Sequence, residues 1–455
     1  MTFQSIDPAS GKKMRVYSEL TDDEIARRIE KAGDAHRSWR QTALRRHTEL
    51  MEKLSGVLRS NNGEYSRLMA LEMGKPVRDG RKEIEKCAWL CRHYAAHAEA
   101  MLESEVVDTD ASRSFVTFQP LGVILAVMPW NYPFWQVFRQ AVPALIAGNA
   151  VLLKHASNVP GCAEAIEDAF DQATFPEGIF QNLPVGSSRV NAIIANPGIA
   201  AVSLTGSTEA GRHVATQAGK HLKKTVLELG GSDPYVILAD ADLNQAVEAC
   251  VTSRLLNSGQ SCIAAKRFVV VEDVRLPFEE KLVRALGDTV MGDPLDEQTE
   301  IGPQAREDLR DQLHRQVRDS LQKGARCLLG GQMPKGPGYF YPPTVLTDVT
   351  RGMAVYDEET FGPVAAVVPV PDEAAAVQVA NDSDFGLGAA VFTRDQARGE
   401  RLAVSEIQAG NCFVNAFVKS DPRLPFGGIR NSGYGRELSH FGLREFVNIK
   451  TVWVH

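Results

Sequence analysis

The sequence lacks the features that place a chain in a membrane or direct it out of the cell. No uninterrupted apolar run reaches about 18 residues, the length that suggests a membrane-spanning helix. The N-terminal stretch MTFQSIDPASGKKMRV has no positively charged start followed by an apolar core, so it does not resemble a secretory signal. We therefore expect a cytoplasmic protein that does not bind membranes.

Excess charge of one sign and an ordered cysteine pattern are also missing. The net charge is −7 without a long basic run, which argues against a nucleic-acid partner. The 7 cysteines are odd in number and scattered, as in a chain with reduced thiols. Cys87 and Cys91 are four residues apart in a helical pattern, but no second ligand pair accompanies them, so we expect no metal site.

The length of 455 residues predicts two domains, with room for a small third element. Residues 21–101 have helical periodicity, beginning at the capping signal TDDE. From residue 122 onward, short apolar strands alternate with helices, which predicts an α/β fold with parallel sheets covered on both faces. The glycines at 230 and 231 mark the best boundary, so we expect one domain from 1–102 and 121–230, and a second from 231–440.

Two segments interrupt this layout. Residues 103–120 and 441–455 alternate like exposed strands, and unpaired strands of this kind would promote aggregation. We expect the two segments to pair with one another across a subunit interface, and thus a homodimer or a dimer of dimers.

The stretch NSGQSC ends in the strongest candidate for a nucleophile, Cys262. A thiolate is a strong nucleophile that needs modest activation, and small residues at 258, 259 and 261 leave room around the sulfur. The alternative is a cysteine that fills space in the core, which is the commoner role of a single cysteine.

Two further side chains fit acid-base and oxyanion chemistry. Glu228 ends a predicted strand just before the double glycine, where α/β proteins place ligands, and its apolar neighbours favour a raised pKa. It could instead face solvent. Asn131 lies between a strand and a helix in MPWNYPFWQ, where its amide could donate to an oxyanion or simply cap the helix.

Phosphate-binding fingerprints are incomplete. No G-x-x-x-x-G-K-[ST] motif occurs, and LTGSTEAG is not the G-x-G-x-x-G motif. Gly206 and Ser207 nevertheless lie at a strand end before a helix, where free backbone N–H groups could hold a phosphate. Lys154 and Ser157 follow another strand end, where a ribose could lie.

Seven motifs together resemble those of the aldehyde dehydrogenase superfamily. They occur in the family's order along nearly the whole chain: PWN at 129–131, LKHAS from 153, TGS at 205–207, LELGG at 227–231, GQSC at 259–262, EETFGPV at 358–364 and PFGGIRNSGYGRE at 425–437. The resemblance implies a Rossmann-type cofactor-binding domain over 1–102 and 121–230, a catalytic domain over 231–440, and oligomerisation strands at 103–120 and 441–455.

The resemblance also assigns roles by position. It implies that Cys262 is the nucleophile, that Asn131 and the Cys262 N–H form the oxyanion site, and that Glu228 activates water. The residues that it places around the cofactor are Trp130, Lys154, Ser157, Gly206, Ser207, Leu229, Glu359 and Phe361.

Within the superfamily, the chain looks most like bacterial short-form succinate-semialdehyde dehydrogenases. Arg139 shares a helix face with Trp135, and an arginine suits a substrate carboxylate, although it could also be an ordinary amphipathic-helix arginine. Ser261 and Ser420 are further substrate candidates, Ser420 with a surface turn as its alternative.

Ser157 bears on the choice of dinucleotide. Relatives selective for NAD often have glutamate there, and serine removes its repulsion of a 2′-phosphate, so we expect NADP, with NAD accepted. Other possibilities are glutarate semialdehyde or an uncharged aldehyde as substrate, a cysteine esterase without hydride transfer, or a protein that has kept only the fold.

Overall fold

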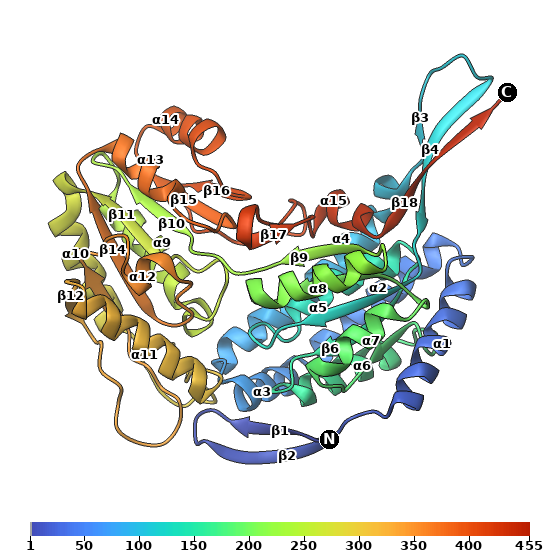
Figure 1. Cartoon of the computed structure of the whole chain (residues 1–455), viewed down its shortest axis with the longest axis horizontal. Coiled ribbons are helices and arrows are strands. Elements are labelled where there is room, and N and C mark those ends of the chain that lie inside the picture. Colours follow the sequence, from blue (N-terminus) through green and yellow to red (C-terminus); the bar gives the residue numbers. More distant parts are fainter. Residues whose placement is uncertain (1) are drawn as a thin grey trace.

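Two open sheets organise the chain, and the computed structural model describes residues 2–455 (Figure 1). The first sheet is parallel except at one edge, where a short strand from the C-terminal part of the chain runs antiparallel. In spatial order its strands are β17 (Gly433–Tyr434), β9 (Lys224–Glu228), β8 (Ile199–Thr205), β5 (Val123–Met128), β6 (Ala150–His155) and β7 (Phe180–Asn182).

The second sheet has seven strands and is parallel except for its edge strand β12. In spatial order its strands are β12 (Arg326–Leu329), β13 (Thr344–Thr347), β14 (Val364–Val370), β11 (Arg267–Val271), β10 (Pro234–Ile237), β15 (Gly388–Phe392) and β16 (Asn411–Val414). The chain passes from the first sheet to the second between β9 and β10, through the double glycine that the sequence singles out.

The second sheet is buried on both faces, as the apolar strands predict. Phe268 and Val270 of β11 belong to the largest core cluster, whereas Val269 and Val271 belong to a separate cluster. Because successive side chains of a strand point to opposite faces, two cores must cover this sheet. The predicted doubly covered parallel arrangement is therefore confirmed here.

The helical pattern of residues 21–101 forms four helices, α1 (Asp22–Trp39), α2 (Leu44–Ser60), α3 (Asn62–Met73) and α4 (Val77–Leu102). The predicted capping box begins α1: Thr21 Oγ1 accepts from Glu24 N, and Glu24 Oε2 accepts from Thr21 N at 2.7 Å. Later helices are α5 (Trp135–Ile146), α6 (Pro160–Gln172), α7 (Val190–Ala195), α8 (Thr208–Lys220), α9 (Leu243–Leu255), α10 (Glu272–Gly287), α11 (Glu307–Gln322), α12 (Ala354–Asp357), α13 (Glu373–Asn381), α14 (Gln396–Arg401) and α15 (Ser439–Glu445).

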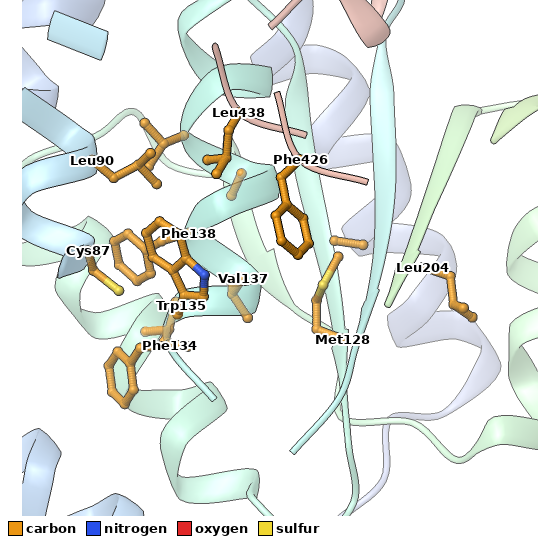
Figure 2. Packing of buried hydrophobic residues seen from close by; sticks show 14 of the residues in the cluster. Cys87, Leu90, Met128, Phe134, Trp135, Val137, Phe138, Leu204, Phe426 and Leu438 are labelled. Atoms are coloured by element: carbon orange, nitrogen blue, oxygen red, sulfur yellow. The ribbon is translucent and has the colours of Figure 1, made fainter. Parts of the chain in front are cut away.

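Helix α5 is buried along its whole length. Figure 2 shows Trp135 and Phe138 on the side that faces Cys87 and Leu90 of α4, and Val137 near the strand β5. A helix that is buried on every side has no solvent face, so its few polar side chains must find partners or line a cavity.

The two exposed segments pair with one another, as predicted, but they do so within one chain. Strand β18 (Val447–Val454) runs antiparallel to β4 (Arg113–Pro120) over eight residue pairs, and β3 (Glu105–Val106) pairs with the other edge of β4. All three belong to one chain and form a ribbon that projects from the body (Figure 1). The expectation that these segments pair across a subunit interface is therefore wrong, because the chain's own C-terminus reaches β4.

Two features escape the sequence patterns. The N-terminal strands β1 (Thr2–Asp7) and β2 (Lys12–Ser18) form a hairpin, and Gly11 in its turn has a φ of 70°. Residues 433–434 return to the first sheet as β17, although they lie in the segment that we assigned to the second domain. The domain boundaries thus stay a prediction. None of the helices between residues 2 and 455 has the length and apolar character to cross a bilayer.

Candidate active site

Two cavities meet at Cys262. One of about 310 Å³ lies toward the first sheet, and another of about 140 Å³ lies between α4, α5 and residues 419–426. Cys262 and Gln136 line both cavities. A sulfur in this position can meet molecules that arrive from two directions, which a space-filling cysteine does not require.

An unusual loop holds Cys262 there. Asn257, Ser258 and Gly259 follow α9 with φ values of 56°, 57° and 77°, all in the left-handed region. Such a run is strained unless the surroundings hold it. Arg254 Nη2 donates to the Gly259 carbonyl at 2.7 Å, and Lys266 Nζ donates to the Cys262 carbonyl at 2.7 Å. Both cations are fully buried.

Asn131 is oriented by the same loop. Its side-chain Nδ2 donates to the backbone carbonyl of Gln260 at 3.1 Å. Its backbone carbonyl accepts from Asn257 Nδ2 at 2.7 Å. An amide nitrogen carries two hydrogens, so one donor remains. Asn131 and Cys262 line the first cavity together. The remaining donor therefore suits the oxyanion that forms when the sulfur adds to a carbonyl group.

The resting sulfur is protonated. Burial raises the pKa of Cys262 to about 12, while the nearby cations Arg139 and Lys266 oppose the shift and Glu359 and Glu228 reinforce it. At neutral pH the free protein thus holds a thiol, whose proton must leave before the sulfur can attack a carbon atom.

Glu228 is buried and is not among the residues that line the two cavities. Neither of its carboxyl oxygens has a hydrogen-bond partner within residues 2–455. Burial raises the pKa of Glu228, Arg139 opposes this, and Glu437 adds to it. The predicted solvent-facing alternative is wrong, and its role as a base stays a prediction.

The first cavity contains most of the residues expected around a dinucleotide. Trp130, Gly206, Ser207, Leu229, Glu359 and Phe361 all line it. The Trp130 and Phe361 rings meet edge to face with centroids 5.7 Å apart.

Several observations fit a dinucleotide in this cavity. Ser207 caps the 13-residue helix α8 by accepting from Ala210 N, and the other N–H groups of the first turn have no partner within the helix and could hold a phosphate. The Thr205 hydroxyl, another lining group, is buried without a hydrogen-bond partner in the described chain. A Cβ at Gly230 would lie 2.6 Å from Glu359 Oε2, so glycine is needed for that carboxylate to face the cavity.

Lys154 and Ser157 lie apart from this cavity. Lys154 is buried at the end of β6, and burial lowers its pKa. Ser157 lines a separate hollow of about 650 Å³ between the N-terminal hairpin and the start of α11, together with Arg306. A dinucleotide would have to extend beyond the first cavity to contact both residues.

The second cavity contains all four predicted substrate residues, Trp135, Arg139, Ser261 and Ser420. Arg139, however, already has a partner: it forms a buried ion pair with Glu437, and its guanidinium lies 4.7 Å from the centroid of the Phe426 ring. Its charge is therefore compensated inside the protein, which the helix pattern does not indicate.

Other lining residues were missed: Lys75, Asp79, Lys82, Glu83, Lys86, Tyr132, Lys419 and Phe426. The α4 residues carry no signal, because EKCAWL looks like an ordinary amphipathic helix. Glu437 lies inside the motif GYGRE and could have been singled out there. In the chain from residue 2 onward, no group of three or more His, Cys, Asp or Glu side chains is arranged to hold a metal ion.

Comparisons with known proteins agree with this geometry. Residues 1–452 match the model of the aldehyde dehydrogenase family. The chain is 46% identical over 449 residues to succinate semialdehyde dehydrogenase [NAD(P)+] Sad of Escherichia coli K12. The aligned region covers 99% of this chain and 97% of the relative. It is 46% identical over 457 residues to succinate-semialdehyde dehydrogenase [NADP(+)] 1 of Mycobacterium tuberculosis H37Rv, with full coverage of both chains.

Solved structures show the same fold. The succinic semialdehyde dehydrogenase of Streptococcus pyogenes, crystallised with NADP+, matches with a TM-score of 0.97 and 36% identity over 99% of both chains. A lactaldehyde dehydrogenase structure matches with a TM-score of 0.96 and 30% identity, over 100% of this chain and 96% of that one. The fold therefore accommodates different aldehydes, and the substrate must be argued from the second cavity.

Gly259→Ala should disrupt the loop that carries Cys262. The residue has a left-handed φ, and a Cβ there would lie 2.3 Å from backbone atoms of Gly362. We expect kcat/KM to fall about a hundredfold, because a shift of about 1 Å in a reacting group can cost that much. Gly56→Ala in α2, where a Cβ meets nothing within 4 Å, should keep activity and raise the free energy of unfolding by about 0.5–1 kcal/mol. Equal activity in the two variants would contradict a strained, positioning loop.

The protonated state of Cys262 can be measured by alkylation. In protein free of dinucleotide, the rate of iodoacetamide addition to Cys262 should keep rising about tenfold per pH unit between pH 7 and 9.5, because its pKa is near 12. A free thiol, with a pKa of about 8.5, levels off in that range. Mass spectrometry of the peptide with Cys262 gives the rate, and a plateau below pH 9 would show that the thiol is already activated.

Proposed function

Because this chain belongs to the aldehyde dehydrogenase family, we propose that it oxidises succinate semialdehyde to succinate with a nicotinamide dinucleotide, NADP in preference to NAD. The observation that carries the proposal is the position of Cys262, between a cavity lined by dinucleotide-type residues and a cavity lined by cations. An aldehyde with a carboxylate at its far end fits such a pair of cavities.

The first steps use Cys262 and Asn131. The thiol transfers its proton to solvent water, and the sulfur bonds to the aldehyde carbon while the C=O π bond opens and the carbonyl oxygen takes up the negative charge. The second hydrogen of Asn131 Nδ2 and the Cys262 backbone N–H stabilise that oxygen; the loss of one such donor costs about 2.7–4 kcal/mol in comparable sites. Residues that line the first cavity would hold the dinucleotide, which would supply the acceptor for the hydride that leaves the carbon atom.

A thioester on Cys262 remains, and Glu228 serves its hydrolysis. The Glu228 carboxylate takes a proton from water, the water oxygen bonds to the acyl carbon, and the sulfur leaves. Burial raises the pKa of Glu228, which makes its carboxylate a stronger base once the proton is lost. Since Glu228 lines neither cavity, this role requires its side chain to rotate toward Cys262.

Two residues support the dinucleotide preference. Ser157 carries no charge, so nothing at that position repels a 2′-phosphate, and Lys154 lies three residues earlier at the end of β6. Arg306 lines the same hollow as Ser157, but Asp308 already compensates its charge at 2.7 Å. Relatives whose names specify NADP(+) or NAD(P)+, and a neighbour crystallised with NADP+, agree with this preference.

Assembly and location complete the proposal. The ribbon of β3, β4 and β18 exposes Val106, Ile449 and Trp453, and large exposed apolar side chains on a projecting sheet favour contact with another copy. We propose a homodimer or a dimer of dimers that uses this ribbon. We also propose that the enzyme works in the cytoplasm.

Steady-state kinetics test the substrate and the cofactor together. With NADP, kcat/KM for succinate semialdehyde should exceed that for butanal, which has the same chain length without the carboxylate, by about tenfold or more, because a charged contact contributes about 1.5–3 kcal/mol. The value with NADP should exceed that with NAD. Absorbance at 340 nm measures the rate. Equal values for the two aldehydes would contradict the proposed substrate class.

Glu228→Gln should separate hydride transfer from hydrolysis. We expect kcat to fall at least about a hundredfold, the usual size of general-base catalysis, while the first turnover still forms one reduced dinucleotide per site in a rapid burst. Cys262→Ser is the matched control and should lose the burst as well. An undiminished kcat in Glu228→Gln would exclude Glu228 as the base.

A further inference from the structure

We propose that Lys86 of α4 is the main anchor for the distal carboxylate of the substrate, a role that sequence reasoning assigned to Arg139. The inference rests on the proposed function, because it presumes an aldehyde that carries a carboxylate. It concerns the second cavity, which Lys86 and Cys262 both line. The substrate class is short aldehydes with a terminal carboxylate.

Lys86 is placed to meet a molecule in that cavity. It lines the same space as Cys262 and is partly buried. Its Nζ donates to Ser420 Oγ at 2.8 Å and lies 4.2 Å from the centroid of the Trp135 ring. A hydroxyl and an aromatic face hold the ammonium in position but do not neutralise it.

Every carboxylate near Lys86 already has another cation. Glu83 pairs with Lys75 and also accepts from the backbone N–H groups of Phe134 and Trp135 at 2.9 Å. Two other nearby carboxylates also form ion pairs: Asp79 lies 3.0 Å from Lys82, and Asp421 lies 2.6 Å from Arg423.

The remaining carboxylate at this end of the cavity, Glu437, pairs with Arg139. Within residues 2–455, no carboxylate oxygen lies within 4.0 Å of Lys86 Nζ. The cavity therefore contains one uncompensated, partly buried positive charge. An ammonium removed from water without a counter-charge is costly, and a bound carboxylate supplies that charge.

The two cations thus have different tasks. Arg139 is 2% exposed and balances Glu437, so its removal would leave a buried carboxylate near Glu228 as well as alter the cavity. Lys86 forms no ion pair with a carboxylate of the described chain. A variant of Lys86 should therefore change the recognition of the substrate with little effect on the reacting groups.

The titration of Lys86 is consistent with this geometry. Its pKa is lowered to about 8, first by burial and next by the positive charge of Arg139 on α5, while Cys87 and Glu83 on its own helix and Asp421 on the facing loop oppose this shift. Lys86 is charged below about pH 8 and neutral above it. Carboxylate recognition through Lys86 should accordingly weaken as the pH rises through this range.

The test compares two aldehydes in Lys86→Met. The KM for succinate semialdehyde should rise roughly ten- to hundredfold with little change in kcat, since a charged hydrogen bond is lost, while kcat/KM for butanal changes less than about threefold. Lys86→Gln, which keeps a polar group for Ser420, should behave alike and guards against a fault in the packing of Lys86→Met. Lys86→Arg, which keeps the charge, should retain most of the preference for succinate semialdehyde.

Lys419→Met tests whether Lys86 acts by direct contact with the substrate carboxylate or only through the general positive electrostatic potential of the cavity. Lys419 is exposed at the cavity mouth, where solvent and salt screen its charge, so we expect a change of at most about threefold in kcat/KM for succinate semialdehyde. In wild type, the ratio of kcat/KM for succinate semialdehyde to that for butanal should fall between pH 7 and 9.5. In Lys86→Met this ratio should be low and flat.

The outcomes distinguish the two proposals. If wild type prefers succinate semialdehyde and Lys86→Met and Lys86→Gln keep that preference, the assignment of Lys86 is wrong and the proposed function stands. If wild type shows no preference for the carboxylated aldehyde, the proposed substrate fails and the assignment fails with it. If Lys86→Met and Lys419→Met lose kcat/KM for succinate semialdehyde equally, the general positive potential of the cavity attracts the substrate, and Lys86 is not its anchor.

Discussion

The reach of the Cys262 sulfur into two cavities depends on one short backbone segment. Three consecutive left-handed residues turn the chain after α9, and the buried side chains of Arg254 and Lys266 hold its carbonyl groups. The same segment accepts the hydrogen bond that orients Asn131. A loop made rigid in this way fixes Cys262, the proposed nucleophile, relative to Asn131, the proposed oxyanion donor, because neither can move without breaking a buried hydrogen bond.

Buried positive charges are common in this molecule, and their partners reveal their tasks. Lys266 and Arg267 donate to backbone carbonyls and so support loops and strand ends. Lys75 and Arg139 pair with carboxylates and so balance charge between elements. Lys86 has only a hydroxyl and an aromatic ring. A cation in a cavity that the protein leaves unbalanced is a natural place for an anionic group of the substrate.

The predicted parts of the fold are those with strong local periodicity. Strands such as β5, β8 and β11 and helices such as α5 follow from apolar runs and helical spacing, which act within a few residues. The N-terminal hairpin was not predicted because its strands are mostly exposed or half-buried, so no strongly apolar run marks them. Strand β17 was not predicted because it has only two residues and its partner β9 lies far earlier in the chain. The two ribbon segments were recognised and correctly expected to pair with one another, but the expected pairing across a subunit interface was wrong, because a sequence pattern does not show which chain supplies the partner strand.

The sequence by itself determined the family, most of the order of the elements and the residues that we propose to react, because these depend on residue types and on motifs whose spacing is local. Only the tertiary structure decided which charges neutralise one another. Glu437 reaches Arg139, and Ser420 reaches Lys86 across 334 positions, through contacts that no periodicity encodes. Electrostatic partnership depends on distances of a few ångströms in space, so the cation that is left for the substrate becomes visible only after folding.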